Sequence, residues 1–339
     1  MTSPAPRRPP SATDPGEGSD PPPSATPYRI RVEEFLTAAT ADHARAVLAQ
    51  ALPADQMDDR FDYWPTDSPP APENTSASDQ PFVAALASDR SGQPVGFLGG
   101  APDRGGLRLD VLVVPAVTQP AELVQAMLVH LEPAIDALAP GNQPFDAIEL
   151  WGRPAPDWLP AAAEQWGFQP HRQLFQMIGP LPAQATAIPT RPLDPDRSTD
   201  ITQLVEVNNR AFAHHPDQGT LTVSGFTETM GEPWFTAEGV RLHERDGRLA
   251  GFCWTKVHRY DQHPATPDMG EIYVIGVDPD YHGQGLGVPM TAAGLQWLSD
   301  QGLTVGMLYV EADNEPAIRT YRRLGFSVAR ADMAWLKSR

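Results

Sequence analysis

The chain has 339 residues, of which 41% are hydrophobic, so it is long enough for two domains with cores of ordinary size. Its formal net charge of −18 argues against a nucleic-acid or anionic-membrane partner, because both are bound through Lys and Arg. The single cysteine, Cys253, excludes intrachain disulfides and multi-cysteine metal sites, and its strand-like setting favours a packed thiol over a nucleophile.

Residues 1–27 are expected to form a disordered tail. They are rich in Pro, Ser, Gly and Asp and include almost no large apolar side chain, so they cannot offset their ordering entropy. The tail lacks the apolar core of a secretory signal, and its acidic residues are not typical of a transit peptide. No run of the chain approaches the roughly 20 apolar residues that a membrane span needs. Together these features favour a cytoplasmic protein.

Three landmarks recur in one order in the two halves of the chain, which predicts a tandem repeat. They are residues 92–97 with 247–252, 112–115 with 275–279, and 164–168 with 322–326. We therefore expect one domain at residues 28–180 and a second at residues 199–339. Residues 181–198, which are rich in Pro, Ala and Asp, would form a linker and first-strand region.

The second half reads as a mixed α/β domain. Its apolar spacing predicts helices at residues 201–212, 287–301 and 315–324, and strands at residues 240–244, 249–257, 271–277, 308–311 and 326–336. The dipeptide Asp246-Gly247 predicts a tight turn that joins the first two strands as an antiparallel pair.

A glycine loop between an apolar strand and a helix predicts a phosphate-binding site. The strand at residues 271–277 leads into the sequence HGQGLG at residues 282–287. Such a junction aims several backbone N–H groups at one point, and glycines let the main chain approach a bulky anion where a Cβ would obstruct it. An ordinary tight turn is the alternative, because glycine-rich loops alone are weak evidence.

Two motifs together resemble the paired signature of the GNAT superfamily of N-acetyltransferases. They are Val277-x-Pro279-x-x-His282-x-x-Gly285-x-Gly287 and Asn314-x-x-Ala317-x-x-x-Tyr321-x-x-x-Gly325-Phe326. The resemblance implies two tandem GNAT-like α/β domains, each with a mixed, mostly antiparallel central sheet flanked by helices. It also implies acetyl-CoA as the acetyl donor, and no metal. The loop motif of the family usually begins with Arg or Gln, where this chain has His282.

The resemblance also implies where acetyl-CoA binds and which groups move protons. The donor would contact Ile275, Gly276, Val277, His282, Gly283, Gln284, Gly285, Leu286, Gly287, Val288, Asn314 and Arg319. Glu271 would accept the ammonium proton of the acceptor directly or through water, and Tyr321 would protonate the departing thiolate. An unperturbed phenol has a pKa of about 10 and can donate at neutral pH. A surface carboxylate and a core tyrosine are the alternatives.

A closer resemblance, strong from about residue 208 onward, is to the family of mycothiol synthases. It is carried by residues 208–219, 251–258, 270–277 and 308–314. Members of that family acetylate the cysteinyl amine of cysteinyl-glucosaminyl-inositol. The implied acceptor contacts are Asp217, Lys256, Glu271 and Tyr309, with Asp217 standing where the family has glutamate. The partner would be this small-molecule amine, with no nucleic acid and no membrane, and we expect a monomer.

The first half lacks the corresponding chemistry. Alignment of the repeat puts Leu107 opposite Glu271 and Ala163 opposite Tyr321, and residues 118–123 contain no glycine. We therefore expect only the second half to be catalytic. The first half would support the fold and wall the acceptor cleft, because pockets favour domain interfaces.

Other readings remain open at this point. One is a tandem acetyltransferase that acts on another small amine, and another is a non-catalytic acetyl-CoA sensor. Lys256 could equally extend along a strand towards solvent. The group His258, Tyr260, Asp261 and His263 lies in a loop without the fixed spacing of metal ligands, so solvation is favoured over a metal site.

Overall fold

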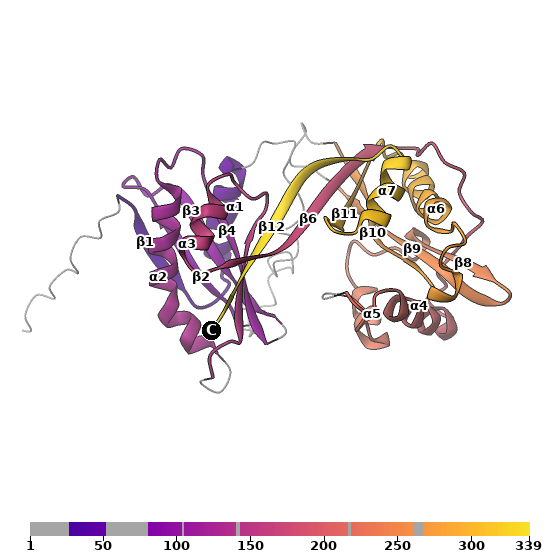
Figure 1. Ribbon diagram of the computed structural model, residues 1–339, viewed down its shortest axis with the longest axis horizontal. Helices are drawn as coiled ribbons and strands as arrows, with labels where there is room; N and C mark the ends of the chain where they lie inside the picture. The colour runs from indigo at the N-terminus through magenta and orange to yellow at the C-terminus, as the bar shows by residue number, and fades with distance from the viewer. Residues whose placement is uncertain (1–26, 52–80, 104, 140–142, 216–217, 260–266) are drawn as a thin grey trace, which may run out of the picture.

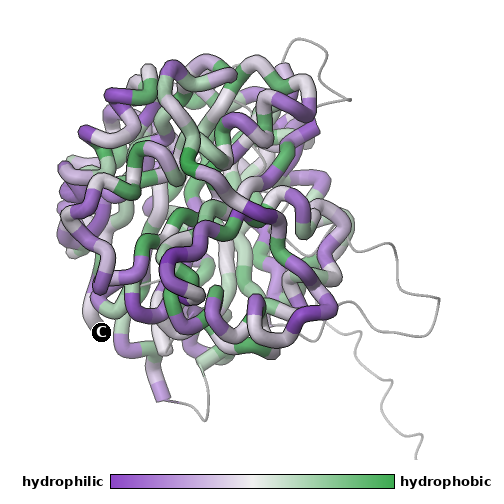
Figure 2. Tube along the Cα trace, turned by 90° about the vertical axis from the view of Figure 1, so that its right-hand side faces the viewer, coloured by the Kyte–Doolittle hydropathy of each residue, from purple (hydrophilic) through white to green (hydrophobic). Residues whose placement is uncertain are grey.

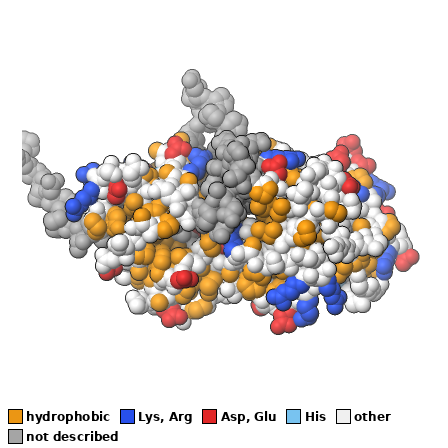
Figure 3. Space-filling view, turned by 90° about the horizontal axis from the view of Figure 1, so that it is seen from above, with side chains coloured by type: hydrophobic (Ala, Val, Ile, Leu, Met, Phe, Trp, Pro, Cys, Tyr) orange, Lys and Arg blue, Asp and Glu red, His pale blue; other side chains and the backbone are white. Residues whose placement is uncertain are grey.

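The computed structural model describes residues 27–51, 81–103, 105–139, 143–215, 218–259 and 267–339. Residues 1–26 of the expected tail lie outside this set. Within the described part of the chain, no helix combines the length and the apolar character that crossing a bilayer requires. The two halves lie side by side along the long axis of the molecule (Figure 1), which is also horizontal in the space-filling view of Figure 3.

Helices and strands follow each other in nearly the same order in both halves. The first half contains β1 (Arg29–Glu33), α1 (Ala38–Ala51), β2 (Val83–Ser88), β3 (Pro94–Asp103), β4 (Gly106–Val113), α2 (Pro120–Leu138), β5 (Ala147–Gly152), α3 (Leu159–Gln165) and β6 (Gln169–Pro180). The second contains β7 (Arg191–Pro192), α4 (Ser198–Ala211), α5 (Val223–Thr229), β8 (Val240–Arg245), β9 (Arg248–His258), β10 (Met269–Val277), α6 (Gly287–Asp300), β11 (Val305–Glu311), α7 (Glu315–Arg323) and β12 (Ser327–Ser338).

All of these strands join one sheet in the order β1-β2-β3-β4-β5-β12-β6-β11-β10-β9-β8-β7. In each half the first four strands are antiparallel neighbours, and the fourth and fifth strands, β4–β5 and β10–β11, are parallel. The repeat inferred from the sequence is therefore a repeat of topology.

Each half gives its last strand to the other. The last strand of the first half, β6, pairs with β11, and the last strand of the second half, β12, pairs with β5. The two exchanged strands also pair with each other at the centre of the sheet. Figure 1 shows both of them running from one half to the other. The boundary that we placed at residue 180 thus divides strands that share one sheet, and the domain limits remain a prediction.

The exchange is visible in the cores. In the first half, the buried side chains of β2–β5 and α1–α3 pack around residues such as Phe97 and Leu131, and Trp335 of β12 is fully buried among them. In the second half, α6 and α7 cover one face of the sheet and α4 and α5 the other (Figure 1). Hydrophilic residues are prominent on the outer turns of the chain (Figure 2).

The predicted elements of the second half are present, with small shifts at their ends. The turn at Asp246-Gly247 has positive φ at both residues, as a two-residue hairpin turn requires, and it joins β8 to β9. The helix predicted from residue 201 begins at Ser198. The strand predicted from residue 308 begins at Val305. Its second residue, Gly306, is not typical of a strand, but a Cβ there would be only 3.0 Å from the ring of Phe326.

Candidate active site

The parallel strands β10 and β11 separate in the middle of the second half. They pair only from Met269–Ile272 on β10 to Val305–Leu308 on β11. The register of β10 against β9 then shifts between Ile272 and Val274, which is the mark of a bulge, and β10 stays paired with β9 as far as Val277. The separation leaves the second part of β10 beside an opening in the sheet.

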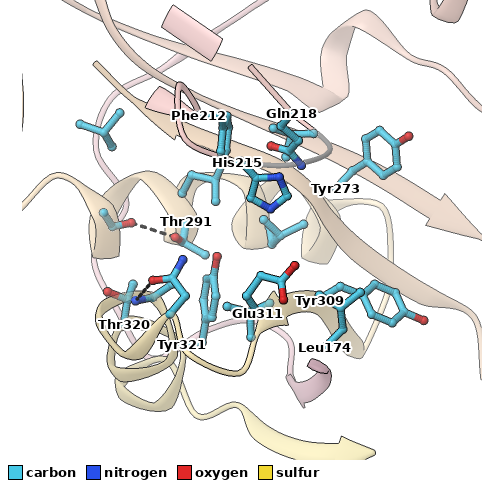
Figure 4. A pocket seen from close by; sticks show the side chains of 18 of the residues that line it. Leu174, Phe212, His215, Gln218, Tyr273, Thr291, Tyr309, Glu311, Thr320 and Tyr321 are labelled. Carbon is cyan, nitrogen blue, oxygen red and sulfur yellow. Dashed lines mark hydrogen bonds between the residues drawn. The ribbon is translucent and has the colours of Figure 1, made fainter. Parts of the chain in front are cut away.

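A cavity of about 360 Å³ occupies this opening (Figure 4). One wall is β10 from Ile272 to Val277, and the opposite wall is formed by β11 and α7. His215 and Gln218, from the segment after α4, face this second wall across the cavity. Of the residues proposed from the sequence, those that line the cavity are Ile275, Val277, Gly287, Tyr309, Asn314 and Tyr321.

Tyr321 reaches the cavity from α7. Its residue is 7% exposed, and Figure 4 shows its ring and hydroxyl directed into the cavity. Burial raises the pKa of Tyr321 well above its ordinary value, with a smaller effect from Cys253. Asn314 begins the same helix, because its side chain accepts a hydrogen bond of 3.2 Å from the backbone N–H of Ala317. The cap expected at Asn314 is therefore present. Because the pKa of Tyr321 is raised, its phenol is protonated at neutral pH and can donate a proton.

Glu271 is buried and hydrogen-bonded rather than exposed beside a turn. Its carboxylate accepts a bond of 2.9 Å from Nε2 of His258, and the two side chains are 7% and 2% exposed. Lys256 is the cross-strand neighbour of Glu271, is itself 4% exposed, and has Nζ 5.0 Å from the centre of the Trp234 ring. Neither Glu271 nor Lys256 lines the cavity, although Ile272 and Tyr273, which follow Glu271 on β10, do.

The glycine loop is open at two of its glycines. Gly283 and Gly285 have φ of 75° and 74°, and a Cβ at either position would meet no atom within 4 Å. Leu286 precedes α6 and no side chain caps this end of the helix, so the N–H groups of Gly287 and Val288 are available to a ligand; the next residue, Pro289, has none. His282 donates from Nε2 to the carbonyl of Val277 at 2.9 Å, so the departure from the family motif ties the loop to the end of β10.

The remaining donor contacts proposed from the sequence lie around this loop. Gln284 is exposed, and its Oε1 accepts a bond of 2.8 Å from Arg245. Leu286 has a buried side chain, so only its backbone could meet a ligand. Arg319 is exposed on α7 and pairs with Glu315 at 2.9 Å. Gly276 and Val288 do not line the cavity.

Residues of the exchanged strands β6 and β12 bond to two side chains of β11 that line the cavity, Tyr309 and Glu311. The hydroxyl of Tyr309 accepts bonds from Nε2 of Gln176 at 3.0 Å and from Nη2 of Arg330 at 2.9 Å, and these donors belong to β6 and β12. Arg172 of β6 forms an ion pair with Glu311 of β11. Arg172 and Glu311 both line the cavity.

Sequence reasoning missed several of these residues. Glu311 could have been found, because it lies two positions after Tyr309 on a strand and so points to the same face. Arg172 could not, because only the strand exchange brings β6 beside β11. His258 is a hydrogen-bond partner of Glu271, whereas Tyr260, Asp261, His263 and the proposed contact Asp217 lie outside the described residues.

Among the residues that are described, no group of His, Cys, Asp and Glu could hold a metal ion.

The chain resembles solved acetyltransferase structures along most of its length. A GCN5-related N-acetyltransferase from Sphaerobacter thermophilus has a TM-score of 0.68 at 18% identity, over 91% of this chain and 95% of that one. A tandem GNAT protein from the clavulanic acid biosynthesis pathway has a TM-score of 0.58 at 18% identity, over 92% and 98%. At such identities the likeness concerns the fold alone, and it confirms the tandem α/β arrangement.

Sequence relatives are more informative. The model of the acetyltransferase (GNAT) family matches residues 205–326. A mycothiol acetyltransferase from Acidimicrobium ferrooxidans is 38% identical over 237 residues, which is 68% of this chain and 74% of that protein. One from Pseudarthrobacter chlorophenolicus is 38% identical over 67% of this chain and 68% of its own length. One from Catenulispora acidiphila is 42% identical over 203 residues, and the chain spans 62% of its length.

Proposed function

Because this chain belongs to the family of mycothiol acetyltransferases, within the GNAT acetyltransferases, we propose that it acetylates the cysteinyl amine of cysteinyl-glucosaminyl-inositol to form mycothiol. The observation that carries the proposal is the cavity between the separated strands β10 and β11, with the hydroxyl of Tyr321 inside it and the glycine loop beside it. A buried carboxylate, Glu271, lies one residue from its wall.

The donor would be held by backbone groups. We assign its phosphates to the glycine loop of residues 282–287, where three glycines carry no Cβ, and to the uncapped start of α6. The edge of β10 at Ile275 and Val277 can pair with an extended chain as an added strand would. Bound acetyl-CoA would supply an acetyl group activated as a thioester.

Two side chains would move the protons of the reaction. Glu271 takes a proton from the ammonium group of the acceptor, directly or through water, and leaves the lone pair that forms the new C–N bond. Tyr321 gives its phenolic proton to the sulfur as the C–S bond breaks. Such assistance is typically worth ~100- to 10,000-fold in rate.

The acceptor would bind on the side of the sheet that carries Lys256 and Tyr309. Lys256 and Glu271 are cross-strand neighbours and so share a face of the sheet. A polyhydroxyl acceptor needs several donors and acceptors, which Lys256 and Tyr309 can supply. Because Gln176 on β6 donates to the hydroxyl of Tyr309, we assign to the first half a part in holding this wall. We also propose a cytoplasmic location and a monomer.

One assay separates this function from its alternatives. Purified protein, acetyl-CoA and cysteinyl-glucosaminyl-inositol are expected to release CoA and to give a product heavier by one acetyl group. Turnover with other amines and none with this conjugate would point instead to a tandem acetyltransferase of another substrate. Binding of acetyl-CoA without turnover on any amine of a broad panel would indicate a sensor.

A further inference from the structure

We propose that Glu311, held by Arg172, binds the protonated amine of the acceptor before Glu271 removes its proton. The inference rests on the proposed function and adds a binding residue to it. It also names the chemical group that this residue recognises, which is a primary ammonium.

The charge of the cavity wall favours a cationic ligand. Among the described residues that line the cavity, Glu311 is the only acidic side chain. The amine of an amino-acid conjugate is protonated at neutral pH, with a pKa near 8. An ammonium that enters a partly enclosed site needs an anionic partner to replace its lost hydration. Glu311 is the lining group that can supply one.

Glu311 is oriented to meet a ligand in the cavity. Its side chain is 18% exposed, and Figure 4 shows the carboxylate directed into the cavity beside Tyr321, opposite His215. Arg172 donates from both Nε, at 3.0 Å, and Nη2 to the same oxygen, Oε1. A carboxylate has lone pairs on both oxygens, so Oε2 can accept a bond from the ammonium while Oε1 keeps its partner.

Arg172 makes the carboxylate a fixed group. The guanidinium is 10% exposed and lies 5.5 Å from the centre of the Trp151 ring on β5. It therefore reaches Glu311 from the first half, through the exchanged strand β6. A side chain that is already ordered loses less entropy when the ligand binds. The first half would thus contribute to acceptor affinity without touching the reacting atoms.

The arrangement separates binding from proton removal. Glu271 lies outside the cavity lining, on the part of β10 that still pairs with β11, and it is hydrogen-bonded to His258. The ammonium would first bind Glu311, and then lose one proton to Glu271, directly or through water. Neutralising the amine weakens its attraction to Glu311, and this frees it to form the C–N bond.

The decisive test compares a charged and a neutral ligand in the same site. For wild type and Glu311→Gln, dissociation constants are measured for the amine acceptor and for its N-acetylated product, which carries a neutral amide. The substitution is expected to weaken amine binding by roughly 10- to 100-fold and to leave product binding unchanged, because a hydrogen bond to a charged group is worth ~1.5–3 kcal/mol. Equal effects on both ligands, or none, would overturn the inference.

Controls distinguish a failure of this inference from a failure of the proposed function. Wild-type turnover with the conjugate tests the function; if another amine is the substrate, the same comparison uses that amine and its amide. Glu132→Gln on α2, an exposed carboxylate paired with Arg339 at 3.7 Å, should change the affinity for neither ligand. Arg172→Gln should weaken amine binding less than Glu311→Gln does, because the carboxylate remains. Acetyl-CoA affinity should stay within about two-fold in all variants.

Discussion

His258 on β9 and Glu271 on β10 form a hydrogen bond of 2.9 Å in the interior of the second half. His258 faces Met269 in the strand register and Glu271 faces Lys256, so the bond runs diagonally across the strand pair. An ionised carboxylate only accepts hydrogen bonds, so the imidazole is the donor. His258 is thus placed to hold the proposed base in one orientation.

We predict that loss of this donor lowers kcat. His258→Leu should reduce kcat by roughly 10- to 100-fold, because a buried carboxylate without its donor costs about 1–3 kcal/mol to keep in place. His258→Gln should recover most of the rate, because the amide nitrogen of Gln can donate from nearly the same position as Nε2. Steady-state kinetics with both substrates measure the effect, and the KM for acetyl-CoA should not change.

A second histidine provides the control. His243 on β8 is also nearly buried, and its Nδ1 donates to the carbonyl of Pro189 at 2.9 Å, away from the cavity. His243→Gln should leave kcat unchanged. If His258→Leu kept the wild-type kcat, or if His258→Gln were as slow as His258→Leu, the positioning role would be wrong.

Tyr321→Phe should cut kcat by at least about 100-fold with little change in acetyl-CoA affinity, because only the proton donor is removed. Burial raises the pKa of Tyr321, so the phenol stays protonated as the pH rises through the range in which an ordinary tyrosine ionises. A fall in wild-type kcat between about pH 8 and pH 10 would therefore belong to another group. Tyr28→Phe in the first half is the control, and an unchanged kcat for Tyr321→Phe would remove it from the mechanism.

Local patterns predicted the elements of the second half and the local geometry of the segments that we propose for the donor site. The turn at residues 246–247, the cap at Asn314 and the glycine loop each depend on a few adjacent residues, and the structure shows the geometry expected of each. The buried position of Tyr321 follows from the same helix pattern. These features were predictable because their physical causes lie within one turn or one strand.

The rest depends on contacts between distant strands. The internal repeat predicts two similar domains, but it does not say that β6 and β12 change places, because either pairing satisfies the same apolar alternation. The ion pair of Arg172 with Glu311 follows from that exchange. Likewise, His258 looked like part of a polar loop, whereas the register of β9 against β10 directs it to Glu271.

Gly285→Val should abolish detectable acetyl-CoA binding. The residue has φ of 74°, so a branched side chain is strained there by about 1–2 kcal/mol, and it would enter the space that we assign to the phosphates. Gly302 at the other end of α6 has φ of 85° and is equally open, so Gly302→Val imposes the same strain far from the loop. Calorimetric titration should show binding in Gly302→Val only; equal affinities in the two variants would argue against the phosphate cradle.

The strand exchange predicts that a residue near the C-terminus stabilises the first half. Trp335 on β12 is fully buried among side chains of the first half. Trp335→Ala should lower the free energy of unfolding by about 3–5 kcal/mol, and Trp335→Phe by much less. Hydrogen exchange should show the loss of protection in β4 and β5 before β9 and β10. Loss confined to the second half would contradict the exchanged arrangement.

Cys253 should be unreactive in the folded protein. It is fully buried, and burial raises the pKa of its thiol to about 12, with smaller opposing effects from a hydrogen bond to the backbone of Gly294 and from Arg241. At about pH 8 the thiolate, which is the reactive form, is therefore almost absent. Since the folded pKa lies above the unfolded value, this thiol contributes stability below about pH 9 that is lost as the pH rises towards 12. Labelling with a chromogenic disulfide should be slow in buffer and complete in denaturant, and rapid labelling of the native protein would show that β9 opens towards α6.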